Sequence, residues 1–109
     1  MVKSLLLAIA LIAPTIASAE TGIASWYGPG FEGKLQANGK PYNQWANTCA
    51  HKTIPLGTIV TITNLNNGKS SRSVVSDRGP YIPGRIIDLS KALNIKLDCH
   101  LCKVKVTRS

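Results

Sequence analysis

The chain has 109 residues, with 13 Lys or Arg against 5 Asp or Glu, and a formal net charge of +8 at pH 7. This length suits one small domain with a modest core, and so few carboxylates leave little choice of group for proton transfer. The basic residues are scattered and form neither a run nor a basic helix, which argues against a nucleic-acid-binding module. The positive charge then serves either to bind an anionic polymer or simply to keep the protein soluble.

The first nineteen residues have the features of a secretory signal peptide. Lys3 gives a short positive region, residues 5–13 are apolar, and Ala17-Ser18-Ala19 forms a small-residue cleavage site. The apolar run is shorter than the roughly 20 residues of a spanning helix, so we expect no stable membrane association after cleavage. The sequence therefore predicts cleavage after Ala19, a secreted or periplasmic location, and one mature domain over residues 20–109.

Strand-like patterns dominate this mature domain. Short β-branched or alternating segments occur at residues 21–27, 58–64, 70–76, 86–87 and 103–107. Asn66-Asn67-Gly68 predicts a hairpin turn between the second and third of these segments. Several short strands with little helix indicate a mainly-β domain, most simply a compact β-barrel, and do not fit a parallel doubly wound sheet.

The connecting segments carry turn and helix signals. Residues 28–39 form a glycine-rich loop, residues 43–48 suggest one helical turn, and residues 77–84 hold two prolines and two glycines in a rigid loop. A helix is expected to end near Lys96, and either Asp88 or Ser90 caps its start. The choice matters because a capping Asp88 would not be free for chemistry.

Two of the five carboxylates lie where an apolar strand ends. Asp77 precedes a Gly-Pro turn and Asp88 precedes the expected helix, so both are candidate proton donors and acceptors at the rim of the barrel. A simpler role for Asp77 is to accept a hydrogen bond within its own turn. Arg78 is expected to point to the opposite side from its neighbour, as successive residues do in extended chain. His51 lies in a predicted loop and is a candidate to orient a carboxylate.

Aromatic side chains gather in and beside the predicted loops. They are Trp26, Tyr27, Tyr42, Trp45 and Tyr81. Because sugar rings stack on aromatic faces, such loops beside a basic rim suit a glycan groove. Core packing is the alternative for the two tryptophans.

Three cysteines lie in the mature domain. In an oxidising compartment the expected bridge joins Cys49 to either Cys99 or Cys102, and leaves one thiol free. A zinc site that combines these thiols with His51 and His100 is the alternative, although their spacing is not a standard zinc motif. We therefore expect no metal and no cofactor.

Several motifs together resemble the rare lipoprotein A (RlpA) family, in order and over nearly the whole mature chain. The motifs are Ala24-Ser25-Trp26-Tyr27-Gly28, Ala37-Asn38-Gly39, the segment 50–58 (AHKTIPLGT), Val60-Thr61-Ile62-Thr63-Asn64, Asn67-Gly68, Asp77-Arg78-Gly79-Pro80-Tyr81 and Gly84-Arg85-Ile86-Ile87-Asp88-Leu89-Ser90. This resemblance implies a six-stranded double-psi β-barrel with one or two short helices, related to expansins and barwin-like proteins. It also implies lytic transglycosylation of peptidoglycan, with a preference for glycan strands that lack stem peptides.

The resemblance also assigns roles to particular residues. His51 and Asp77 match family positions implicated in activity, Asp88 matches an acid used by related barrels, and Lys40 stands where the family usually has glutamate. The residues expected to hold the glycan are Trp26, Tyr27, Lys40, Tyr81 and Arg85.

The leading hypothesis is a monomeric lytic transglycosylase that cleaves the bond from N-acetylmuramic acid (MurNAc) to N-acetylglucosamine (GlcNAc) and leaves a 1,6-anhydro end. One carboxylate suffices for this reaction, whereas hydrolysis usually needs two. The alternatives are a non-catalytic, expansin-like wall-binding module and a barwin-like effector or inhibitor that acts on a protein.

Overall fold

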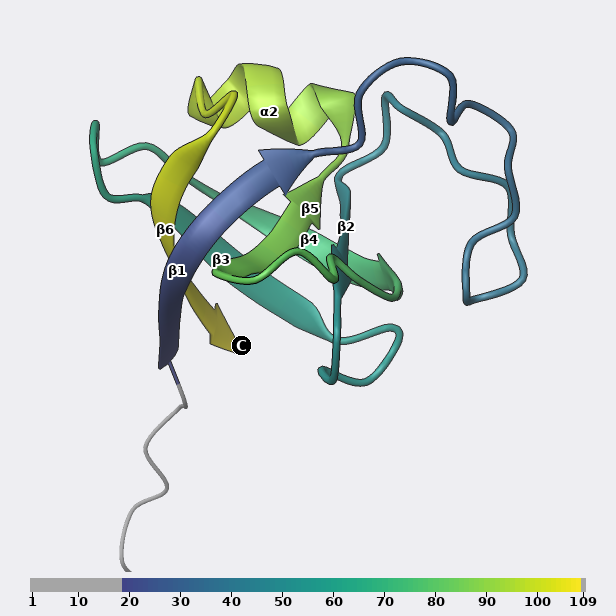
Figure 1. Ribbon diagram of the computed structural model, residues 1–109, viewed down its shortest axis with the longest axis horizontal. Coiled ribbons are helices and arrows are strands. Elements are labelled where there is room, and N and C mark those ends of the chain that lie inside the picture. The colour runs from purple at the N-terminus through teal and green to yellow at the C-terminus, as the bar shows by residue number, and fades with distance from the viewer. Residues whose placement is uncertain (1–18, 109) are drawn as a thin grey trace, which may run out of the picture.

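The computed structural model describes residues 19–108 as a closed barrel of six strands with one short helix (Figure 1). The elements are β1 (Ala19–Trp26), β2 (Thr48–His51), β3 (Ile59–Asn64), β4 (Ser70–Asp77), β5 (Arg85–Leu89), α2 (Lys91–Leu97) and β6 (Cys102–Arg108). The strands follow one another around the barrel in the order β1-β5-β2-β4-β3-β6. The predicted mainly-β, six-stranded barrel is therefore confirmed.

The barrel mixes parallel and antiparallel pairs. β1 pairs in parallel with β5, and β2 in parallel with β4, while the other four pairs are antiparallel. β1 and β6 lie side by side along their length, from Ala19 opposite Thr107 to Ala24 opposite Cys102. Closure of the sheet leaves no exposed edge within the described barrel.

Alternating apolar residues fill the barrel, and the helix covers one end of it (Figure 1). In β3, Val60 and Ile62 are fully buried, whereas Ile59, the first residue of the strand, is exposed. Leu93 and Leu97, four residues apart on α2, are also fully buried. Each such side chain stabilises the fold by roughly 1.5–3 kcal/mol relative to an exposed one.

Ser90, and not Asp88, caps the helix. The Ser90 hydroxyl accepts a hydrogen bond from the Leu93 amide at 3.3 Å, and Ser90 has the extended backbone typical of an N-cap. Asp88 remains within β5 and pairs with Ala50 of β2. The helix start therefore leaves the Asp88 carboxylate available for the site.

β2 is the strand that the sequence does not predict. The residues expected to form a helical turn are a simple turn, in which Asn43 accepts hydrogen bonds from the amides of Trp45 and Ala46. The chain then enters β2, which spans only four residues between β4 and β5. A strand this short has no room for a recognisable period, so the prediction of a helical turn over residues 43–48 is wrong.

The disulfide also differs from the expected one. Cys99 bonds to Cys102 across the turn from α2 into β6, with the two Cα atoms 5.1 Å apart. Cys49 is a free thiol buried in the core from β2. The prediction of a bridge from Cys49 is wrong because the turn from α2 into β6 brings Cys99 and Cys102 within bonding distance of each other. Among residues 19–108, no three metal-binding side chains cluster.

The proposed leader, residues 1–19, lies almost entirely outside the described residues, so the structure leaves its role and the cleavage after Ala19 as predictions. Within residues 19–108, no helix is long and apolar enough to cross a membrane.

Candidate functional site

The register of four adjacent strands places the two rim carboxylates on one face of the barrel wall. Ala50 of β2 is aligned with Asp77 of β4 on one side and with Asp88 of β5 on the other, and Asp88 is aligned with Ser25 of β1. Aligned residues on neighbouring strands project to the same face of a sheet. Strand spacing puts the two aspartate Cα atoms roughly 10 Å apart. The small side chain of Ala50 leaves the space between them open.

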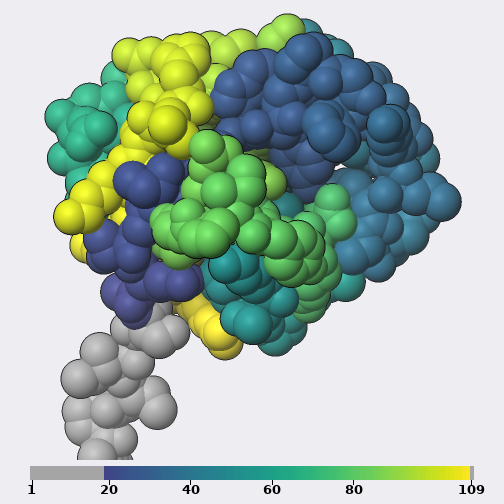
Figure 2. All heavy atoms as spheres, viewed as in Figure 1, coloured from purple at the N-terminus to yellow at the C-terminus, as the bar shows by residue number. Residues whose placement is uncertain are grey.

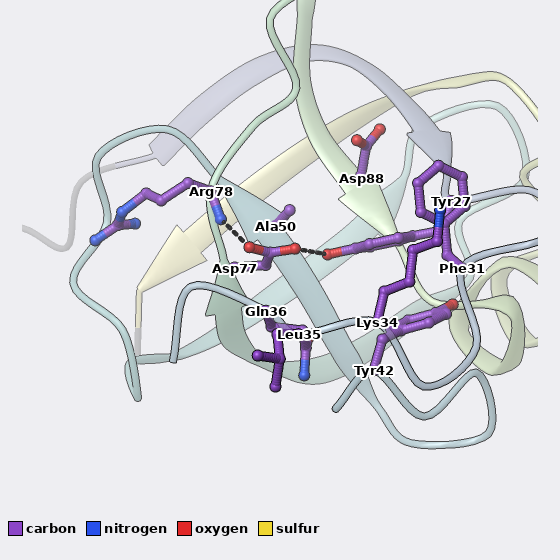
Figure 3. Close-up of a pocket in the computed structure, with 10 residues that line it drawn as sticks. All are labelled: Tyr27, Phe31, Lys34, Leu35, Gln36, Tyr42, Ala50, Asp77, Arg78 and Asp88. Atoms are coloured by element: carbon purple, nitrogen blue, oxygen red, sulfur yellow. Dashed lines mark hydrogen bonds between the residues drawn. The ribbon is translucent and has the colours of Figure 1, made fainter. Parts of the chain in front are cut away.

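Both carboxylates line a cleft of about 300 Å³ (Figure 3). The barrel contributes Ala50, Asp77, Arg78 and Asp88, and the segment that follows β1 contributes the other lining residues. These are Tyr27, Phe31, Lys34, Leu35, Gln36 and Tyr42. The cleft therefore has an acidic floor made by strands and a wall made by one long loop.

Three donors hold the Asp77 carboxylate in place. The backbone amides of Ala37 and Arg78 donate to Oδ1 at 2.8 and 2.9 Å, and the Tyr27 hydroxyl donates to Oδ2 at 2.8 Å. One donor comes from the strand end, one from the loop and one from the end of β1. The carboxylate is thus fixed in orientation while it faces the cleft.

The Arg78 side chain points away from Asp77, as the alternation of extended chain predicts (Figure 3). Its guanidinium Nη1 donates to the carbonyls of His51 and Ile54 at 3.1 and 2.6 Å. No ion pair joins Arg78 to Asp77 among residues 19–108. Arg78 therefore ties the end of β2 to the following loop and leaves the carboxylate to its three neutral donors.

Asp88 is held more loosely than Asp77. Its Oδ1 accepts a hydrogen bond from the Ser25 hydroxyl, at the position that the register of β1 and β5 dictates. This is its one side-chain hydrogen bond among the described residues, so Oδ2 has no partner there, and Asp88 lines the cleft.

Aromatic rings form one wall of the cleft. Tyr27 stacks on Tyr42 with ring centroids 4.3 Å apart and planes 13° from parallel, and Phe31 meets the Tyr27 ring edge-on at 5.8 Å. Burial, followed by the hydrogen bond to Asp77, raises the pKa of Tyr27 well above its usual value. Burial likewise raises the pKa of Tyr42. Both phenols therefore stay protonated, and Tyr27 acts as a hydrogen-bond donor at neutral pH.

A small hairpin between Leu35 and Pro41 holds the loop against β4. The Ser76 hydroxyl donates to Gln36 Oε1 at 2.6 Å, and the Asn38 amide donates to the Ser76 carbonyl at 3.2 Å. In the space-filling view the segment that follows β1 forms a blue lobe beside the barrel (Figure 2). The lobe is thus anchored beside Asp77 by both backbone and side-chain bonds.

His51 does not meet Asp77 in this structure, contrary to the predicted orienting role. Its Nδ1 accepts the amides of Thr53 and Ile54, each at 3.1 Å, which leaves Nε2 to bond Glu20 Oε1 at 2.7 Å. The side chain is buried and does not line the cleft. Side chains alternate along β2, so Ala50 faces the cleft and the next residue faces elsewhere.

Of the residues predicted to hold glycan, only Tyr27 lines the cleft. Trp26 packs against the core, which matches the alternative weighed for it, and Tyr81 is 76% exposed on the loop after β4. Lys40 lines a separate groove, and Arg85 lies at the opposite end of β5 from Asp88 and Leu89. The hydrogen-bonding partners Ser25 and Gln36 were not predicted as site residues, although Ser25 lies within a family-like motif.

A family model described as lytic transglycolase matches residues 19–107, which is nearly all of the described barrel. The chain belongs to the lytic transglycolase family. It is 57% identical over 77 residues to the endolytic peptidoglycan transglycosylase RlpA of Campylobacter jejuni, covering 71% of this chain and 28% of that protein. It is 56% identical over 88 residues to a probable endolytic peptidoglycan transglycosylase RlpA of Synechocystis, covering 81% and 27%. The chain thus spans little more than a quarter of these relatives.

A solved structure shares the fold of this family member. The Streptomyces papain inhibitor superposes with a TM-score of 0.65 at 24% identity, covering 88% of this chain and 98% of that one. This likeness supports the double-psi barrel architecture alone.

Proposed function

We propose that this protein is a peptidoglycan lytic transglycosylase that cleaves the bond from MurNAc to GlcNAc and prefers glycan strands without stem peptides. The observation that carries the proposal is the pair Asp77 and Asp88, aligned on either side of Ala50 in a cleft with an aromatic wall. The names of its relatives support the same reaction class.

In the proposed mechanism Asp77 serves in turn as acid and base. Its proton passes to the oxygen that links MurNAc C1 to GlcNAc, the C1–O bond breaks, and GlcNAc leaves with a free hydroxyl. The Asp77 carboxylate then takes the proton of the muramyl C6 hydroxyl while that oxygen bonds to C1. The proton count balances, and no water is consumed.

The surrounding groups fit this sequence of steps. Tyr27, Ala37 and Arg78 donate hydrogen bonds that keep Asp77 oriented through both proton transfers. Asp88, which lines the cleft and has one oxygen without a hydrogen-bond partner in the described chain, supplies negative charge near the positive charge that develops at C1. The rings of Tyr27 and Phe31 offer apolar faces for the sugars. His51 does not contact the substrate in this mechanism. Its Nδ1 holds the amides of Thr53 and Ile54, and so fixes the loop whose Ile54 carbonyl binds Arg78.

We further propose that the protein acts outside the cytoplasm as a monomer, after loss of residues 1–19. The bridge between Cys99 and Cys102 supports an oxidising compartment. Glu20, the residue after the proposed cut, is within β1 and bonds His51.

The test is incubation of the purified protein with sacculi stripped of stem peptides by an amidase, followed by mass spectrometry of the released ends. Anhydro-muramyl ends support the proposal. Reducing ends would instead indicate hydrolysis by the two carboxylates. Binding without any released end would favour the expansin-like wall-binding module.

A further inference from the structure

A second groove of about 300 Å³ lies behind the hairpin that anchors the loop to β4. Gln36 lines both the groove and the catalytic cleft. Ser76 faces the groove and Asp77 faces the cleft, because successive residues of β4 point to opposite sides. The groove therefore adjoins the site and is separated from it by the end of one strand and one hairpin.

Two side-chain amides in this groove, those of Asn38 and Asn43, have free hydrogen-bond donors. Asn38 Oδ1 accepts the Lys40 amide at 2.9 Å, and Asn43 Oδ1 accepts the Trp45 amide at 3.0 Å. These bonds fix which end of each side-chain amide is nitrogen. Neither amide nitrogen donates to another group among residues 19–108, so both remain available to a ligand.

The charge of the groove is positive. Lys40 is its one charged lining residue and forms no ion pair within the described chain. A neighbouring hollow on the outer face of β4 shares Val74 with the groove and adds Arg72, again with no carboxylate among its lining residues. An ammonium group that lines the same groove as two free amide donors, with no carboxylate among the lining residues, suits an anionic oxygen ligand.

We propose that this groove binds a carboxylate of the same peptidoglycan strand whose glycosidic bond lies in the cleft; the inference rests on the proposed function. Peptidoglycan offers two carboxylates of this chemistry. One is the lactyl group of a muramyl residue that carries no peptide, and the other belongs to the stem peptide. In either case Lys40 pairs with the carboxylate and contributes to substrate affinity, and it takes no part in bond cleavage.

The test compares Lys40→Gln with Lys69→Gln, which removes the same charge from an exposed turn outside both the cleft and the groove. Three substrates are used: peptide-free glycan, the same glycan after its carboxyl groups are converted to amides, and glycan that keeps its stem peptides. On a carboxylate-bearing substrate, Lys40→Gln raises KM about 3- to 5-fold, as expected for one exposed ion pair, and leaves kcat within about twofold. On the amidated glycan neither variant differs from wild type.

The substrate on which KM rises identifies the carboxylate. A rise with peptide-free glycan assigns the lactyl group, and a rise only with stem-bearing glycan assigns the peptide. Equal behaviour of the two variants on all three substrates overturns the inference. If wild type releases no ends at all, the proposed function fails separately, and the same comparison by co-sedimentation with the three glycans still decides whether the groove binds a carboxylate.

Discussion

Replacement of Tyr27 by phenylalanine tests whether its hydroxyl holds Asp77 in place. The change removes one of three donors to the carboxylate, at 2.8 Å, and keeps the ring that stacks on Tyr42. A hydrogen bond to a charged group contributes roughly 1.5–3 kcal/mol when buried, and less where solvent reaches it. Because Tyr27 is only partly buried, we expect a loss of about 1 kcal/mol in the free energy of unfolding, or about 4–8 °C in Tm.

Activity should fall more clearly than stability. A carboxylate freed to rotate loses its alignment with the glycosidic oxygen, and a penalty of about 1.4 kcal/mol in the transition state lowers kcat about tenfold. Thermal unfolding followed by circular dichroism and the rate of anhydro-end release measure the two effects. Tyr81→Phe, at a ring that is 76% exposed, is the control for stability. If Tyr27→Phe matches wild type in both Tm and kcat, the hydroxyl does not position Asp77.

Three further predictions concern the frame that carries the site. Burial raises the pKa of the Cys49 thiol from 9.0 to about 12. The free energy of unfolding should therefore be unaffected by this thiol below pH 9, and should decline as the pH rises toward 12, by up to about 1.4 kcal/mol per pH unit. Urea unfolding at several alkaline pH values should show that the free energy of unfolding falls less steeply with pH in Cys49→Ala than in the wild type. Equal slopes for the two proteins would contradict this. Reduction of the bridge from Cys99 to Cys102, which spans four residues, should lower the free energy of unfolding by about 2 kcal/mol, and peptide mapping that links either residue to Cys49 would refute the pairing. Ser90→Ala removes the helix cap and should cost about 1–2 kcal/mol, whereas the exposed Ser70→Ala should cost little; equal effects would argue against the cap.

The barrel could be predicted from the sequence because most of its strands carry their own signals. The β-branched run in β3 and the alternation in β6 each predict a period of two that the burial of these strands follows. The Asn-Gly pair predicts the turn before β4 from its residue types. β2 carried no such signal, since four residues show no period and its position depends on partners from β4 and β5. The missing strand also hid the register that brings Asp77 and Asp88 together.

The candidate site was predictable only in part, for a related reason. Scarcity of acids and their place at strand ends pointed to the two aspartates, and the resemblance pointed to the same residues. The direction of a side chain at a strand end depends on register, so His51 was expected beside Asp77 but bonds Glu20 instead. The disulfide was mispredicted for a similar reason, because the geometry of the turn after α2, which the sequence does not report, brings Cys99 and Cys102 together.

The central claim, that Asp77 carries the proton in lytic cleavage, is tested most directly by Asp77→Asn on peptide-free glycan. Asparagine keeps an oxygen for the amides of Ala37 and Arg78 and an amide group for the Tyr27 oxygen, so the fold should remain intact. Wild type should release 1,6-anhydro ends, and the variant should release them at least about a thousandfold more slowly while it still binds the glycan. Release of anhydro ends by a folded Asp77→Asn protein at the wild-type rate would contradict the account.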